Sequence, residues 1–210
     1  MKKVYLLTFY RIFFAGLALA ALITQLIHGM RQEGFSTVNF LSFFTIESNI
    51  IAVFVLTASA LRGRNKQRAG LDFWRGAATL YLTITGIVYT LLLSGADVEL
   101  TLPWVNSVLH YLMPVAILAD WLLDRPYKSI PLRQALAWMV FPAVYLIYSL
   151  ARGPLANWYP YPFLDPTQHD YPRVVLTSLI LAVAAIGLTW LLTGVSNWSH
   201  PVEEKHSHTA

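Results

Sequence analysis

Apolar side chains dominate six long runs of this 210-residue chain, and short polar segments separate the runs. The runs cover residues 9–29, 40–61, 72–94, 103–123, 132–150 and 171–195. Each is close to the roughly 20 residues that a helix needs to cross a hydrocarbon core about 30 Å thick. A backbone in lipid must satisfy its own hydrogen bonds, which helices do. The pattern therefore predicts an all-α bundle of six transmembrane helices.

The six runs leave little room for a second domain. We expect one transmembrane domain over residues 1–195, followed by a disordered cytoplasmic tail over 196–210. The longest connection, residues 151–170, joins the fifth and sixth runs and is rich in proline and aromatic residues. Proline excludes a regular helix there, and aromatic rings suit the membrane interface. This segment could lie on the headgroups, or cap or enter the outer end of the bundle.

Charge sets the orientation of the runs in the membrane. Lysine and arginine gather at alternate ends of the runs: Lys2, Lys3 and Arg11, then Arg62, Arg64, Lys66, Arg68 and Arg75, then Arg125, Lys128 and Arg133. Cytoplasmic loops carry this excess. Both termini are therefore predicted to be cytoplasmic, and the 151–170 loop external.

Composition supports a membrane protein and excludes several other classes. Hydrophobic residues make up 56% of the chain and charged residues 12%, about half the charged fraction of soluble domains. There is no cysteine, so disulfide and thiol chemistry are excluded. The net charge of +4 is spread over short loops and does not predict a nucleic-acid partner. The expected partner is the lipid bilayer, and the oligomeric state is left open.

Polar residues inside two runs form the candidate site. Thr45, Ser48 and Asn49 share one helical face, and Asn106 and His110 share another. Counted from the outer ends of their runs at 1.5 Å per residue, Thr45 lies about 7–8 Å deep and His110 about 10 Å deep. If the two helices are neighbours, the hydroxyl and the imidazole can meet.

Such a pair has a familiar chemistry. A hydroxyl becomes a nucleophile when a base removes its proton, and histidine is the usual base near neutral pH. Thr45 and His110 are thus candidate nucleophile and base. Candidates to orient the histidine or to stabilise an oxyanion are Asn49, Asn106, Ser48, Tyr89, Tyr145, Tyr148 and Asp165. Polar residues of these types also join membrane helices without catalysis, so a structural role stays open.

Glu47 is a further ionisable residue within a run, pointing away from Thr45. In lipid it must be protonated, hydrated or paired, for example with His28 or Arg31. Glu47 and His110 could instead be proton or ligand contacts of a transport or lipid-binding protein, since Pro114 and Pro142 interrupt two of the runs.

A metal-dependent membrane hydrolase is the other alternative. It would take three ligands from the side chains predicted on the outer side: His28, Glu47, His110, Asp165 and His169. Their spacing places no two of them on one helical face, so we expect no metal or other cofactor.

Asp120 and Asp124, near Arg125, are interpreted as interfacial charges at the cytoplasmic end of the fourth run. Trp74, Trp121 and Trp138 match the aromatic belt on the same side.

Three short motifs occur in order along the chain: Phe44-Thr45, Asn106-x-x-x-His110, and the segment from Trp158 to Leu164. With six runs, this order resembles the androgen-induced, FAR-like family of membrane proteins, and in particular its bacterial six-span relatives, often labelled Pr-six-Pr. The resemblance implies an intramembrane hydrolase of fatty acid esters with Thr45 as nucleophile and His110 as base, in a bacterial inner (plasma) membrane. The sequence departs from the eukaryotic pattern after the threonine, where Glu47-Ser48-Asn49 follow, which leaves the substrate open.

Overall fold

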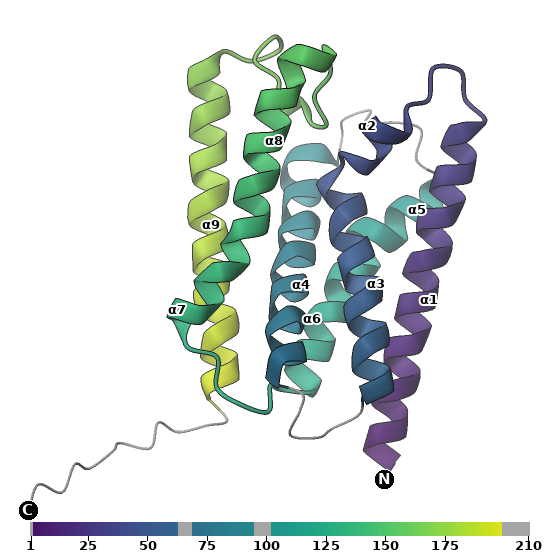
Figure 1. The fold of residues 1–210 in the computed structure, drawn as a ribbon, viewed down its shortest axis with the longest axis vertical. Coiled ribbons are helices and arrows are strands. Elements are labelled where there is room, and N and C mark those ends of the chain that lie inside the picture. The colour runs from purple at the N-terminus through teal and green to yellow at the C-terminus, as the bar shows by residue number, and fades with distance from the viewer. Residues whose placement is uncertain (1, 63–68, 95–101, 199–210) are drawn as a thin grey trace, which may run out of the picture.

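The computed structural model describes residues 2–62, 69–94 and 102–198 (Figure 1). Within these ranges the chain is helical, and six helical stretches are long and apolar enough to cross a membrane. This confirms the predicted six-span, all-α architecture and defines a multi-pass integral membrane protein. Most of the predicted tail, from residue 199 onward, lies outside the described residues.

The first three spans are α1 (Lys2–Met30), α3 (Phe44–Arg62), and α4 (Ala69–Val88) with its π-helical end (Tyr89–Leu93). The fourth span consists of α5 (Pro103–Ser107), a π-helical turn (Val108–Leu112) and α6 (Met113–Leu123). The fifth consists of α7 (Leu132–Ala135), a 3-10 turn (Leu136–Met139) and α8 (Val140–Ala156), and the sixth is α9 (Tyr171–Asn197). Short helices, α2 (Thr37–Leu41) and a 3-10 turn (Pro162–Leu164), lie between spans. The start of α1 and the end of α9 lie at the same end of the bundle (Figure 1).

Several helices extend beyond the predicted apolar runs. The first begins at Lys2 rather than residue 9, and the fifth continues to Ala156 rather than residue 150. Hydropathy indicates which residues lie in lipid, whereas a helix continues until its backbone leaves the helical conformation. In the fifth span this happens at Asn157, whose φ of 47° is left-handed, a conformation that asparagine tolerates.

The fifth span is irregular near Pro142, which has no N–H to donate to the carbonyl of Trp138. That carbonyl instead accepts a hydrogen bond of 3.0 Å from the Tyr81 hydroxyl of α4. The irregular start of the span is thereby tied to the centre of the bundle.

The spans differ in how much the protein covers them. The most apolar stretch of α3 is 56% buried and those of the third and fourth spans are 50% buried, whereas the fifth and sixth spans reach 22% and 17%. In Figure 1, α8 and α9 lie to one side of the bundle of α1, α3, α4 and α6. The last two spans therefore expose most of their apolar surface to the surroundings, as lipid-facing helices do.

Charged side chains cross-link three spans at the end of the bundle where α1 begins. Arg11 donates to Asp120 at 2.6 Å and to Asp124 at 2.5 Å. Arg75 donates to Asp120 and to Asp72, both at 2.7 Å. All five residues are buried. Pairing makes burial of these charges tolerable, so the cluster joins α1, α4 and α6.

This cluster corrects two sequence interpretations. Asp120 and Asp124 are each 1% exposed and pair with Arg11 and Arg75, so they are not interfacial charges. Trp121 and Trp138 are core side chains, not belt residues: they are 0% and 1% exposed, and the Arg75 guanidinium lies 5.7 Å from the Trp121 ring. Of the three tryptophans, only Trp74 is exposed.

The segment after α8 enters the bundle. The Arg152 side chain donates to Asn39 at 2.6 Å and lies over the Trp158 ring, which contacts Phe43 edge to face. A Cβ at Gly153 would lie 2.0 Å from the ring of Tyr159, so glycine lets this ring pack against α8. Further along the segment, Tyr161 and Leu164 are 6% and 3% exposed. The burial of these two side chains shows that this part of the segment packs against the helices.

Candidate functional site

Thr45 lies in the first turn of α3, directly after the corner that joins α2 to α3. Backbone N–H groups in the first turn of a helix have no acceptor within that helix. The Thr45 N–H donates instead to the Tyr161 hydroxyl at 3.3 Å. The helix start and the 157–164 segment therefore meet at this threonine.

The Thr45 hydroxyl lies within hydrogen-bond distance of His110. Thr45 Oγ1 and His110 Nε2 are 3.2 Å apart, although the residues are 65 positions apart in sequence. The second and fourth spans therefore bring the two predicted residues together at matching depth. Their catalytic roles stay predictions.

The contact of the other ring nitrogen indicates the tautomer of the neutral imidazole. His110 Nδ1 lies 3.2 Å from the Asn106 carbonyl, which can only accept a hydrogen bond. In the neutral ring Nδ1 therefore carries the proton, and Nε2 is left with a lone pair facing Thr45. This is the tautomer that a general base acting on Thr45 needs.

A π-helical turn shapes the helix around His110. The Met113 N–H donates to the Val108 carbonyl, five residues back, rather than to that of Leu109. The free Leu109 carbonyl accepts a hydrogen bond of 3.3 Å from Asn49 Nδ2, which also donates to the Thr45 carbonyl at 2.8 Å. Asn49 thus joins the two helices beneath the Thr45–His110 pair rather than orienting the imidazole.

The Tyr89 ring stacks on one face of the imidazole. The two rings stack with centroids 4.0 Å apart and planes 25° apart. The Asn106 side chain donates to the Tyr89 hydroxyl at 2.6 Å. The helices that carry Tyr89 and His110 approach closely because Gly86 has no side chain; a Cβ there would lie only 3.0 Å from Pro114 Cβ. Asn106 and Tyr89 are therefore the candidates that position His110, through a carbonyl and a ring face.

The remaining predicted hydroxyl groups lie around Thr45 without contacting the imidazole. Ser48 donates to the Thr45 carbonyl at 3.2 Å and lies 3.1 Å from the Thr85 hydroxyl. The Tyr145 hydroxyl donates to the Ser42 carbonyl at 3.0 Å, and Tyr148 lies 2.8 Å from the Ser42 hydroxyl. Tyr145 and Tyr148 therefore tie α8 to the corner before α3.

Asp165 does not orient His110, contrary to that expectation. Its carboxylate accepts hydrogen bonds from Thr167 at 2.7 Å and Gln168 at 2.9 Å, within its own turn. Partial burial raises the pKa of this carboxyl, but the hydrogen bonds outweigh burial and leave the pKa below its usual value. Asp165 is a charged turn-forming residue.

The other ionisable residues do not form a second site. Glu47 is half-buried, and no ion pair joins it to His28 or Arg31 in the structure. Among the described residues, which include all five proposed ligands, no group of three acidic or histidine side chains could hold a metal ion. The geometry therefore does not support the metal-site alternative.

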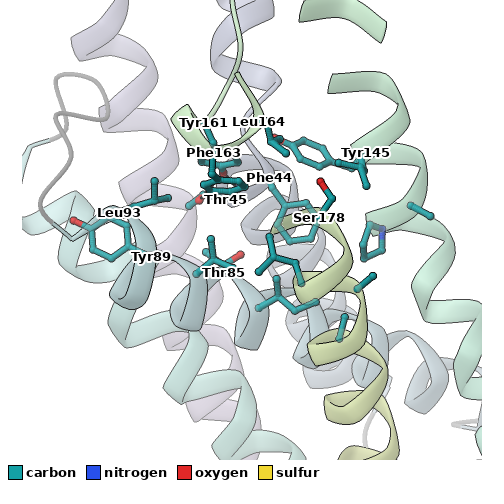
Figure 2. A pocket seen from close by; sticks show the side chains of 18 of the residues that line it. Phe44, Thr45, Thr85, Tyr89, Leu93, Tyr145, Tyr161, Phe163, Leu164 and Ser178 are labelled. Carbon is teal, nitrogen blue, oxygen red and sulfur yellow. Dashed lines mark hydrogen bonds between the residues drawn. The ribbon is translucent and has the colours of Figure 1, made fainter. Parts of the chain in front are cut away.

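A cavity of about 190 Å³ lies next to Thr45 (Figure 2). Its walls come from the start of α3, from α4, α8 and α9, and from the 157–164 segment. None of the lining residues among the described part of the chain carries a charge, and their polar side-chain groups include the hydroxyls of Thr45, Thr85 and Ser178. Figure 2 shows Tyr161 and Phe163 above Thr45 at one end of the cavity. Thr45 faces this apolar space, and His110 is not part of its lining.

Tyr161 is the site residue that the sequence analysis missed. Its hydroxyl lies 3.4 Å from Thr45 Oγ1, and its side chain is 6% exposed. The residue belongs to an irregular segment with no periodicity that could indicate its depth. The sequence offered two signals: aromatic residues concentrated beside prolines, and the place of Tyr161 in the motif from Trp158 to Leu164.

The fold and site together define a multi-pass helical membrane protein with a hydroxyl–imidazole pair beside an apolar cavity. Comparison with protein-family models, with curated proteins and with solved structures finds no match to this chain. The function is therefore inferred from the geometry of the site.

Proposed function

We propose that the protein is an intramembrane lipid-ester hydrolase with Thr45 as nucleophile and His110 as general base. One observation carries the proposal: Thr45 Oγ1 lies 3.2 Å from His110 Nε2, and Thr45 is one of the residues that line the apolar cavity. A reacting carbonyl in the cavity would meet a hydroxyl whose proton already has an acceptor.

The proposed reaction uses the hydrogen bonds of the site. His110 Nε2 takes the Thr45 proton as Oγ1 attacks the ester carbonyl, and the carbonyl π electrons move to its oxygen. When this tetrahedral adduct collapses, the C–O bond to the alcohol breaks and the leaving oxygen takes the proton from Nε2. Water then attacks the acyl-threonine, with the same nitrogen accepting and returning the proton, and releases the carboxylic acid. Throughout, the Asn106 carbonyl accepts a hydrogen bond from the protonated Nδ1 of His110.

The cavity lining supports a proposal for the substrate class. An apolar space without charged groups favours a fatty acyl chain over a sugar, a peptide or a phosphate ester. Because α8 and α9 form part of the wall and are the least buried spans, such a chain would enter from the bilayer. We place the protein in a bacterial inner membrane with both termini cytoplasmic, so that the cavity opens in the outer leaflet.

A lipid-binding or transport protein that does no chemistry is the second candidate. The cavity favours it, as do the irregular helices at Pro114 and Pro142. Binding alone, however, does not require a hydroxyl hydrogen-bonded to the lone-pair nitrogen of a histidine. Measured hydrolysis of an ester distinguishes the two candidates, because only a hydrolase turns the ester over.

The experiment measures hydrolysis of long-chain fatty acyl esters by purified protein in detergent micelles. Thr45→Ala and His110→Ala are each expected to lower kcat/KM by about 10³-fold or more. Matched controls are Thr57→Ala, on the same helix, and His28→Ala, which also tests the metal alternative. If the wild-type protein is inactive, or if Thr45→Ala and His110→Ala retain its rate, the proposal is wrong.

A further inference from the structure

We infer that Tyr161 is a further catalytic residue, whose hydroxyl donates a hydrogen bond to the oxyanion that forms when Thr45 attacks an ester. This inference rests on the proposed function and deepens it. It assigns a chemical role to the 157–164 segment, which is otherwise only a cover for the cavity.

The position of Tyr161 is defined from three sides. Its ring is parallel to that of Phe163, with centroids 5.2 Å apart and planes 6° apart, and it contacts Phe43 edge to face. Its hydroxyl accepts from the Thr45 N–H at 3.3 Å and lies 3.4 Å from Thr45 Oγ1. A buried, packed phenol of this kind is preorganised, which is what electrostatic stabilisation of a transition state requires.

The direction of each hydrogen bond follows from the groups that can only accept or only donate, at His110 and at the Thr45 backbone. His110 Nε2 is an acceptor, so the Thr45 hydroxyl donates its proton to it. The Tyr161 oxygen accepts from the Thr45 N–H, so the phenol proton is left to donate. The nearest acceptor given by the contacts of Tyr161 is Thr45 Oγ1, at the long distance of 3.4 Å. The phenol therefore has a weakly engaged proton directed at the reacting oxygen.

Burial also keeps this proton in place. It raises the pKa of the Tyr161 hydroxyl, and the hydrogen bonds from Thr45 offset part of that rise. The group therefore stays protonated, and a donor, at neutral pH.

The reaction step needs a donor at this place. When Thr45 Oγ1 bonds to the carbonyl carbon, the negative charge moves to the oxygen bonded to that same carbon. A donor beside Oγ1 on the cavity side can shift to this oxygen as it gains charge. When the adduct collapses and the alcohol leaves with the proton from His110, the carbonyl re-forms. The Tyr161 proton is shared but never transferred, so the step balances.

The other candidate donors near Thr45 are already engaged. The Asn49 amide donates to the carbonyls of Thr45 and Leu109, and the Tyr145 hydroxyl donates to the Ser42 carbonyl. Using either for the oxyanion would break a hydrogen bond that holds the site together. Tyr161 meets the requirement with the least rearrangement.

The test is Tyr161→Phe, which keeps the ring and removes the hydroxyl, with Tyr159→Phe as the matched control from the same segment. Ester hydrolysis is measured as kcat and KM, with kcat expressed per site titrated by a covalent hydroxyl-directed probe. Tyr161→Phe is expected to lower kcat by about 10²-fold with little change in KM. Tyr159→Phe is expected to behave as wild type.

A second readout separates catalysis from structure. A fatty alkyl boronic acid forms a tetrahedral adduct with the Thr45 hydroxyl, whereas an ether analogue of the ester cannot. Tyr161→Phe is expected to weaken binding of the boronic acid by about the same factor by which it lowers kcat, and to leave binding of the ether unchanged. Equal weakening of both ligands, or an unchanged kcat, would overturn the role of Tyr161. Loss of activity in Thr45→Ala with unchanged activity in Tyr161→Phe would overturn this inference alone, whereas inactive wild-type protein would overturn the proposed function as well.

Discussion

Filling the cavity should change which acyl chains the protein accepts. Ala185 lines the cavity from α9 and is 3% exposed, so a larger side chain there must occupy the cavity. Ala185→Leu adds three carbon atoms to this space. The neighbouring Ala184 is exposed and does not line the cavity, so Ala184→Leu adds the same atoms on the outer face.

The magnitude follows from the apolar contacts that are lost. Each buried methylene contributes about 0.8 kcal/mol, so excluding about three methylenes of the acyl chain costs roughly 2.4 kcal/mol. That corresponds to about a 50-fold lower kcat/KM for chains long enough to reach Ala185. Shorter chains should keep the wild-type rate, because the Thr45–His110 pair is untouched.

The assay compares kcat/KM over a series of esters from butanoyl to palmitoyl. Ala185→Leu should shift the preferred acyl chain toward fewer carbons, whereas Ala184→Leu should match wild type at every length. If Ala185→Leu lowers the rate equally for all esters, or if both variants retain the wild-type profile, the acyl chain does not occupy this cavity.

Two further predictions concern the bundle around the site. Arg75→Met leaves Asp72 and Asp120 without the guanidinium between them, so it should lower the free energy of unfolding by about 3–5 kcal/mol. Thermal unfolding in detergent measures this, with substitution of the exposed Arg62 (Arg62→Met) as the control. Equal melting temperatures for the two variants would contradict the prediction. Gly86→Ala places a Cβ 3.0 Å from Pro114 Cβ and should loosen the ring stack on His110, lowering kcat by up to about 10²-fold. Gly16→Ala, where nothing lies within 4 Å, is its control in the ester assay, and equal rates for the two variants would refute the argument.

The six spans could be predicted from sequence because lipid leaves the backbone few options. Apolar runs of sufficient length require helices, and short polar loops require antiparallel neighbours. That Thr45 and His110 lie at a similar height along their helices was also predictable, since a helix rises by a constant amount per residue. Whether the two side chains face each other was not, because the facing depends on how the helices pack.

Contacts between distant parts of the chain account for the errors. Asp120 pairs with Arg75 and Arg11, which are 45 and 109 positions away, while its sequence neighbourhood offered only Arg125. Asn49 was a candidate to orient His110, but the π-helical turn frees the Leu109 carbonyl to bind it instead. Such a turn has no clear sequence signal.

The most direct test of the central claim is the site of covalent modification by a hydroxyl-directed probe. Purified protein would be treated with an alkyl fluorophosphonate, digested, and sequenced by mass spectrometry. The geometry predicts a single adduct on Thr45, which should be lost in His110→Ala although the threonine remains. An adduct on another residue, labelling of Thr45 that persists without His110, or no labelling of a folded protein would contradict the account.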